Sequence, residues 1–90
     1  MPDVRDNTER QRFELDADGH VAFSEYRRDG GVLVIRHTEV PKALEGRGIG
    51  SALARGLLDL ARAQGLKVRP LCPFVAGYIA KHPEYADLRV

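Results

Sequence analysis

The segment that decides the fold is residues 32–60, which read VLVIRHTEVPKALEGRGIGSALARGLLDL. It opens with four consecutive β-favouring residues, Val32 to Ile35, and passes through a glycine-rich stretch, Glu45 to Gly50, into a helical pattern. This order predicts a strand, a glycine loop and a helix. Glycines at alternate positions leave backbone N–H groups uncovered, and the positive end of the helix dipole points at the same place. The segment therefore predicts a site for a phosphate-bearing ligand.

The apolar residues after the loop recur every three or four positions, which is the spacing of one helix face. They are Ile49, Leu53, Leu57, Leu60 and Ala61. With Gly65 as a stop signal, the pattern predicts a helix from roughly Gly48 to Gln64. A short strand at Leu66 to Leu71 should follow, and then a second helix that begins at Pro73 and is ended by Pro83.

The segment before this helix predicts strands joined by tight turns. Apolar and polar residues alternate over Phe13 to Leu15, turn-forming residues occupy Asp16 to Gly19, and the alternation resumes from Val21 to Tyr26. A second turn at Asp29 to Gly31 leads into Val32 to Ile35. The continuous apolar run there predicts a central strand buried on both faces. We therefore expect three strands in an antiparallel meander.

Length and composition limit the classes of function. Ninety residues fit one small domain, and we expect a flexible, mostly polar lead-in at residues 1–12 followed by a single domain at residues 13–90. The 14 Lys and Arg against 13 Asp and Glu give a net charge of +1, so there is no overall positive field for nucleic acid or an acidic membrane. A single cysteine excludes an internal disulfide, and no apolar signal region or spanning segment is seen. We expect a soluble cytoplasmic protein that is a monomer or weak homodimer.

Two common phosphate-binding motifs do not fit the glycine loop. The Walker pattern needs Gly, four residues and then Gly-Lys-Ser/Thr, which the chain lacks. The dinucleotide fingerprint needs a third glycine three positions after the second, but Gly50 is followed at that spacing by Leu53. What remains is an arch of N–H groups at Gly46 to Gly50 that could hold a pyrophosphate, with Arg47 as a local positive charge.

The loop resembles the acetyl-CoA loop of the GNAT N-acetyltransferase superfamily, Arg/Gln-x-x-Gly-x-Gly/Ala between a strand and a long helix, over Gly46 to Leu53. Flanking segments look like those of the short, single-domain members: His37–Pro41, Pro70–Phe74 and Tyr78–Tyr85. The resemblance covers about Phe13 to Leu88. In place of the usual leading Arg or Gln stands Glu45, so backbone amides and Arg47 would have to hold the phosphates.

The resemblance implies an α+β fold in which an antiparallel meander is followed by a helix, a strand and a helix in one mixed sheet. It implies acetyl-CoA as co-substrate and an amine as acceptor, with pantetheine lying between two splayed strands at Val34–Val40 and Lys67–Leu71. The acetyl-CoA contacts expected from it are Thr38, Glu39, Val40, Gly46, Arg47, Gly48, Ile49, Gly50 and Ser51. Transfer would need a base for the amine proton and an acid for the departing thiolate. Short members lack the helices that shape the acceptor pocket, so an open acceptor site is expected.

Four residues are candidates for the proton and acyl chemistry. Cys72 precedes Pro73, which suits a first helical position, so its thiol is expected at a helix N-terminus, where it could accept acetyl or protonate the leaving CoA. The alternative for Cys72 is a small buried hydrophobe. Tyr78 resembles the helix tyrosine that many family members use as general acid, with core packing as its alternative. His37 and Glu39 fall on one side of their strand by alternation and are expected to face the cleft as candidate bases. The alternatives are that Glu39 is simply exposed to solvent and that His37 is a hydrogen-bonded structural residue.

The histidines His20, His37 and His82 show no metal-ligand spacing, so no metal is expected. The sequence thus predicts an acetyl-CoA-dependent N-acetyltransferase acting on an amine of a small molecule or protein. Two alternatives stay open, a non-catalytic acyl-CoA-binding module and a small protein-interaction domain of the same fold. The glycine loop alone would equally suit a tight strand-to-helix turn.

Overall fold

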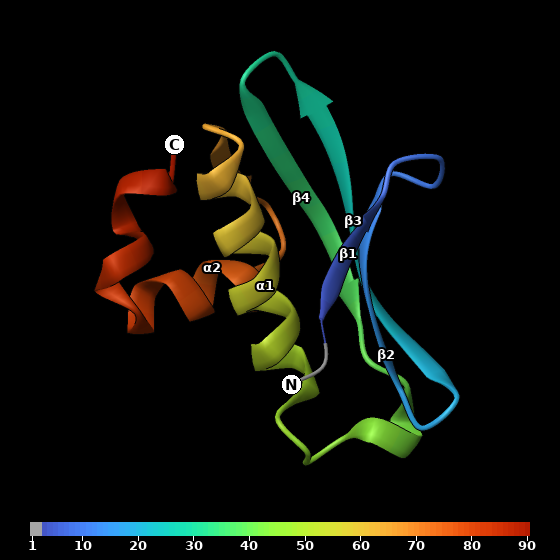
Figure 1. Ribbon diagram of the computed structural model, residues 1–90. Helices are drawn as coiled ribbons and strands as arrows, with labels where there is room; N and C mark the ends of the chain where they lie inside the picture. The colour runs from blue at the N-terminus through green and yellow to red at the C-terminus, as the bar shows by residue number, and fades with distance from the viewer. Residues whose placement is uncertain (1–2) are drawn as a thin grey trace.

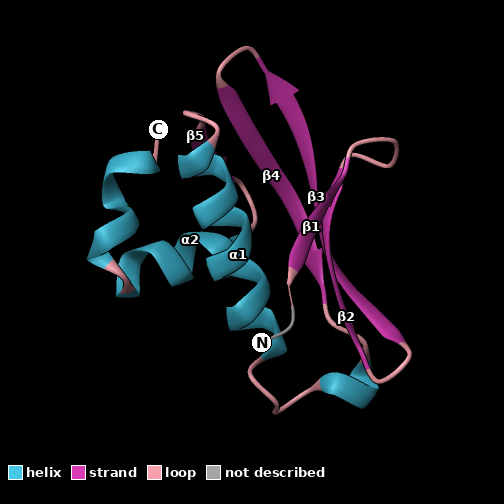
Figure 2. Ribbon diagram, in the orientation of Figure 1, coloured by secondary structure: helices cyan, strands magenta, loops and turns pink. Residues whose placement is uncertain are grey.

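Five strands form one sheet, and the helices lie to one side of its antiparallel part (Figures 1 and 2). The structure is a computed structural model that describes residues 3–90. Its elements are β1 (Val4–Asn7), β2 (Arg12–Ala17), β3 (His20–Asp29), β4 (Val32–Glu39), η1 (Lys42–Leu44), α1 (Ile49–Ala63), β5 (Lys67–Pro70), α2 (Pro73–Lys81) and η2 (Pro83–Leu88). Strands β1 to β4 are antiparallel neighbours in chain order, and β5 pairs in parallel with β4 after the crossover through α1. The mixed α+β sheet expected from the sequence is confirmed.

The meander has one strand more than expected, because Val4–Asn7 form β1 within the lead-in predicted at residues 1–12. The first two residues of that lead-in lie outside the described part of the chain. The strand is held by a close approach to α1, where a Cβ built on Gly56 would lie only 2.2 Å from Cγ2 of Val4. Such a contact between distant segments has no signal in local composition.

The side of the sheet away from the helices carries one buried carboxylate, Glu14, which is 3% exposed. Its oxygens accept hydrogen bonds from Arg5 at 2.7 Å, from Asn7 at 3.2 Å and from Arg12. Burial alone would raise the pKa of Glu14, but these three donors outweigh it and lower the pKa below its usual value. Arg12 in turn lies over the ring of Phe23, 4.4 Å from its centroid.

Strand β4 is fully buried on one face only, which corrects the expectation of burial on both. Leu33 and Ile35 are buried in the core, whereas Val32 and Val34 are half-buried on the opposite face. The reason is architectural: the helices lie to one side of the antiparallel strands, and the other face meets solvent.

The expected apolar stripe on α1 is confirmed for Ile49, Leu53, Leu57 and Ala61, which face the core, whereas Leu60 is half-buried and lines a groove on the outer side. The buried residues of α1 are Ile49, Leu53, Ala54, Leu57, Leu58 and Ala61. The helix begins and ends one residue inside the predicted limits, at Ile49 and Ala63. Gly65 follows with φ +70°, a left-handed conformation that suits glycine after a helix end.

The C-terminal third also follows its sequence signals closely. Pro73 occupies the first turn of α2, and Pro83 begins η2 directly after the helix has ended. Tyr85 of η2 is buried and donates a hydrogen bond of 2.7 Å to Asp59 of α1, which ties the two segments together. Neither helix in residues 3–90 is long and apolar enough to cross a membrane.

Candidate functional site

A β-bulge in β4 determines which side chains face the interior near the end of that strand. Ile35 pairs with Tyr26 of β3, but the next registered pair is His37 with Glu25, so Arg36 is an extra residue on β4. One extra residue exchanges the two faces of a strand from that point on. Leu33 and Ile35 face inward before the bulge, and Thr38, rather than His37, faces inward after it.

The strands β4 and β5 part at the same place. Their parallel register ends at the Ile35–Pro70 pair, and the carbonyl oxygen of Ile35 then accepts hydrogen bonds from the N–H groups of both Leu71, at 3.0 Å, and Cys72, at 3.1 Å. Strand β4 continues to Glu39, and on this side no strand of the described chain pairs with it. The sheet therefore has an opening that begins beside Cys72.

A short chain of hydrogen bonds lines the inner end of this opening. The thiol of Cys72 donates to Oγ1 of Thr38 at 3.3 Å, and Oγ1 of Thr38 lies 2.7 Å from Oγ of Ser24. Ser24 is 0% exposed and Cys72 is 5% exposed. The chain joins the start of α2 to β4 and β3, and it gives the thiol a fixed position at the point where the strands part.

His37 and Glu39 share one side of β4, as expected, but they lie on the face away from Cys72. Nε2 of His37 is 3.5 Å from a carboxylate oxygen of Glu39, and both side chains are more than half exposed. The His37 ring meets the edge of Phe23 on the outer face of β3, with 6.4 Å between centroids. Plain alternation from Ile35 would place both residues inward, and the bulge at Arg36 reverses this.

The glycine loop leads into α1 through two residues in left-handed conformations. Gly46 has φ +77° and Gly48, the residue before the helix, has φ +73°. A Cβ built on either would meet no atom within 4 Å, so glycine is required here for backbone conformation rather than for space. No side chain caps the start of α1, so the N–H groups of its first turn are available to a ligand.

A cavity of about 260 Å³ lies over this loop. It is lined by Val40, Leu44, Glu45, Gly46, Gly48, Ile49, Gly50, Ser51 and Phe74. A Cβ on Gly50 would lie 2.8 Å from the tip of the Phe74 ring, so a larger residue there would require this exposed ring to shift. Arg47 does not line the cavity: its guanidinium pairs with the carboxylate of Asp18 in the β2–β3 turn. The cavity wall is thus made mostly of backbone and apolar groups, with Ser51 as a polar residue and Glu45 as its one charged residue.

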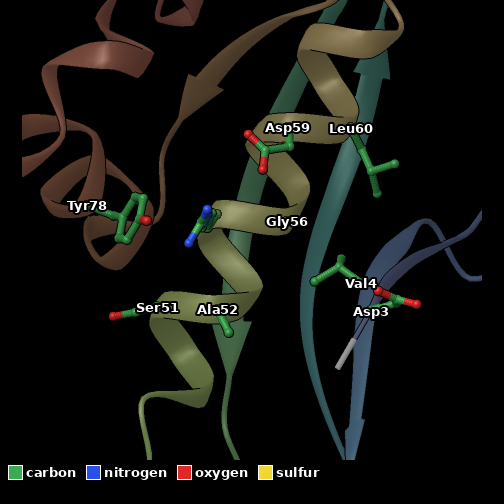
Figure 3. Close-up of a pocket in the computed structure, with 9 residues that line it drawn as sticks. Asp3, Val4, Ser51, Ala52, Gly56, Asp59, Leu60 and Tyr78 are labelled. Atoms are coloured by element: carbon green, nitrogen blue, oxygen red, sulfur yellow. The ribbon is translucent and has the colours of Figure 1, made fainter. Parts of the chain in front are cut away.

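Tyr78 lies apart from Cys72, in a second and larger groove of about 630 Å³ that runs along the outer side of α1 (Figure 3). The groove is lined by Asp3, Val4, Ser51, Ala52, Arg55, Gly56, Asp59, Leu60 and Tyr78. One face of the Tyr78 ring is stacked on His82, with 3.9 Å between centroids. Burial raises the pKa of the Tyr78 hydroxyl above its usual value, and the nearby charge of Arg55 offsets part of that rise.

Sequence reasoning missed three parts of the site. These are the hydroxyl of Ser24, the inward position of Thr38 and the groove beside Arg55. Of these, only Ser24 could have been found from the sequence, because it is a polar residue two positions from each of the core residues Ala22 and Tyr26 of β3. Within residues 3–90, no three His, Cys, Asp or Glu side chains are grouped as metal ligands.

Comparison with known proteins places this geometry in a family. The model of the GCN5-related N-acetyl-transferase family matches residues 12–88. The chain belongs to that family. The curated relatives include Protein NATD1 of Gallus gallus, 36% identical over 52 residues, and of Danio rerio, 33% identical over 55 residues.

These alignments cover 58% and 59% of this chain, and 47% and 50% of the relatives. The chain thus spans about half the length of the NATD1 proteins that it matches. Among solved structures, the solution structure of a GCN5-like protein from Staphylococcus aureus superposes with a TM-score of 0.73 at 26% identity. That match covers 98% of this chain and 87% of the other, so the GCN5-related fold extends over nearly the whole chain.

Proposed function

We propose that this GCN5-related protein is an acetyl-CoA-dependent N-acetyltransferase that transfers acetyl to a primary amine of a small molecule or protein. The observation that carries the proposal is the opening between β4 and β5, which has a buried thiol at its inner end. The glycine-loop cavity adjoins the same strand, because Val40, directly after β4, is one of its lining residues. A ligand with a thioester at one end and a pyrophosphate at the other fits this arrangement.

We assign the acetyl-CoA contacts to backbone groups that no side-chain cap and no neighbouring strand of the described chain engages. The pyrophosphate would bind the N–H groups of Gly46 to Gly50 together with Ser51, at the uncapped start of α1. Pantetheine would lie along the free edge of β4 at Thr38 to Val40, taking the place of a strand. Glu45 on the cavity rim opposes an anion, so backbone donors have to supply most of the binding. Arg47 could contribute its charge only by leaving Asp18.

In the proposed reaction the amine nitrogen attacks the carbonyl carbon of the thioester. The C–S bond breaks, its electron pair stays on the sulfur of CoA, and the thiol of Cys72 gives that sulfur a proton. The Cys72 thiol donates a hydrogen bond to Thr38, and this contact fixes the S–H group at the inner end of the opening, where this role needs it. The amine loses one proton to water, and Cys72 takes up a proton from water again. The exposed His37–Glu39 pair has no step in this route, because it lies on the face of β4 away from Cys72.

The alternative role for Cys72 is to carry the acetyl group itself. Its thiolate would attack the thioester, releasing CoA before the amine arrives. Intact-mass measurement of the protein with acetyl-CoA and no amine separates the two routes, because only this one leaves an acetyl adduct on Cys72. Tyr78 has no step in either route, since it lies in the groove on the outer side of α1.

The test is release of free CoA thiol from acetyl-CoA, with and without a lysine peptide or a diamine. We expect an amine-dependent rate that falls about 100-fold in Cys72→Ala, with the acetyl-CoA-induced rise in thermal midpoint kept. An unchanged rate in Cys72→Ala would remove Cys72 from the chemistry. Stabilisation by acetyl-CoA without amine-dependent thiol release would favour the non-catalytic acyl-CoA-binding module. That second candidate is supported by the position of His37 and Glu39 on the face away from Cys72.

A further inference from the structure

The groove along α1 has a volume of about 630 Å³, and the proposed acetyl transfer leaves it without a role. It is not isolated from the glycine loop, because Ser51 lines both the groove and the loop cavity. Figure 3 shows Ser51 at the end of the groove that belongs to the first turn of α1, with Tyr78 across from the helix. A ligand held at the loop can therefore extend into the groove.

Arg55 is the cation of this groove, and it is without a charged partner. No hydrogen bond or ion pair joins its guanidinium to any other residue in the described part of the chain. Arg5, Arg12, Arg47 and Arg62 each pair with a carboxylate, whereas other exposed arginines of the described chain, such as Arg27, have no carboxylate partner either. What distinguishes Arg55 is its place in the groove. Arg55 follows Ser51 by four residues, so it lies on the same face of α1, about 6 Å further along the helix axis.

The opposite wall supplies a neutral hydrogen-bond donor. The hydroxyl of Tyr78 is directed toward α1 (Figure 3) and keeps its proton, because burial raises its pKa. The groove also contains two carboxylates, but Asp59 lies a further turn along α1 and accepts the hydroxyl of Tyr85, and Asp3 lies on the β1 side. The end of the groove between Ser51 and Arg55 is therefore the end suited to an anion.

Coenzyme A carries two phosphate groups on one ribose, the pyrophosphate on the 5′ oxygen and a phosphate monoester on the 3′ oxygen. With the pyrophosphate at the glycine loop, the monoester lies one ribose away, which is the scale of one helical turn. We infer that Arg55, with the hydroxyl of Tyr78, binds the 3′-phosphate of coenzyme A. The inference rests on the proposed function and adds to it a means of selecting CoA over ligands that lack this phosphate.

The test compares CoA with dephospho-CoA, which differs only in the missing 3′-phosphate, by calorimetric titration at low salt. We expect the wild-type protein to bind CoA about fivefold more tightly, which is the scale of one exposed charge pair, with the preference shrinking as salt is added. In Arg55→Gln most of the preference for CoA should be lost, leaving only the part that the hydroxyl of Tyr78 contributes, with the affinity for dephospho-CoA unchanged. Arg55→Lys should keep part of the preference. The matched control Arg27→Gln, an exposed arginine of β3, should leave it unchanged.

Equal binding of the two ligands by the wild-type protein would overturn the inference and leave the proposed function standing. An undiminished preference in Arg55→Gln would overturn it too, since another group would then hold the phosphate. Failure of both CoA and dephospho-CoA to bind would overturn the inference together with the proposed function. Circular dichroism of each variant checks that it is folded, and the affinity for dephospho-CoA serves as the internal reference.

Discussion

Replacing Thr38 by valine tests the bulge in β4 and the hydrogen-bond chain that depends on it. The substitution keeps the shape of the side chain but removes the hydroxyl that lies 2.7 Å from Ser24 and accepts the thiol of Cys72. Ser24 is 0% exposed, so water cannot replace the lost partner. A buried hydroxyl without a partner costs about 1–3 kcal/mol, and we expect Thr38→Val to lower the free energy of unfolding by about 2 kcal/mol.

The companion variant Ser24→Ala should cost less, about 1 kcal/mol, because Thr38 is half-buried and still accepts the Cys72 thiol. In the double variant both hydroxyls are gone, so its cost should be smaller than the sum of the two by about 1 kcal/mol. Urea unfolding followed by circular dichroism measures all three, with midpoint shifts of about 1–2 M for Thr38→Val.

The control is His37→Gln, next along β4 but exposed on the outer face, for which we expect a change within about 0.5 kcal/mol. If Thr38→Val unfolds at the wild-type midpoint, or if it and Ser24→Ala are strictly additive, Thr38 does not face Ser24. The assignment of the bulge to Arg36 would then fail, because regular alternation would turn Thr38 outward and His37 inward.

Two further predictions concern the β1 side of the sheet. Gly56→Ala should destabilise the protein by about 1 kcal/mol, since overpacking against Val4 exceeds the gain in helix propensity, but in a Val4→Gly background it should stabilise by up to about 1 kcal/mol. Urea unfolding measures both changes in the free energy of unfolding. If Gly56→Ala changes it in the same direction in both backgrounds, the close approach of β1 to α1 is refuted. The pKa of Glu14 is lowered in the folded state, so its contribution to stability is present above the unfolded value of 4.5 and is lost as the pH falls through the lower folded pKa. Glu14→Gln should therefore show a weaker loss of urea midpoint between about pH 5 and pH 2 than the wild-type protein, and parallel pH curves would contradict this.

Elements with signals in neighbouring residues were predictable from the sequence. The spacing of Ile49, Leu53 and Leu57 gave the buried face of α1, and Pro73 and Gly65 marked a helix start and a helix end. In each case the cause is local: the period of a helix, the fixed φ of proline, or the tolerance of glycine for left-handed backbone.

The structure differs from the sequence predictions where contacts between distant segments of the chain determine the conformation. An extra residue at Arg36 is defined only by the pairing of β4 with β3, and it moved His37 and Glu39 to the outer face while it brought Thr38 to Cys72. Strand β1 forms in a polar segment because α1 leaves room for it at Gly56, and Arg47 is drawn to a turn 29 positions earlier in the chain. Such contacts depend on the assembled sheet, and no window of sequence contains both partners.

The parting of β4 from β5 also has a consequence for solubility. It creates a free strand edge in the middle of a sheet, and a free edge is a template on which the strands of other protein molecules can add. The segment that runs along this edge contains Arg36, His37 and Glu39, all exposed and all ionisable. Charged side chains are a recognised protection of strand edges against aggregation, so these residues discourage a second polypeptide from adding at the edge where the proposed acetyl-CoA would lie.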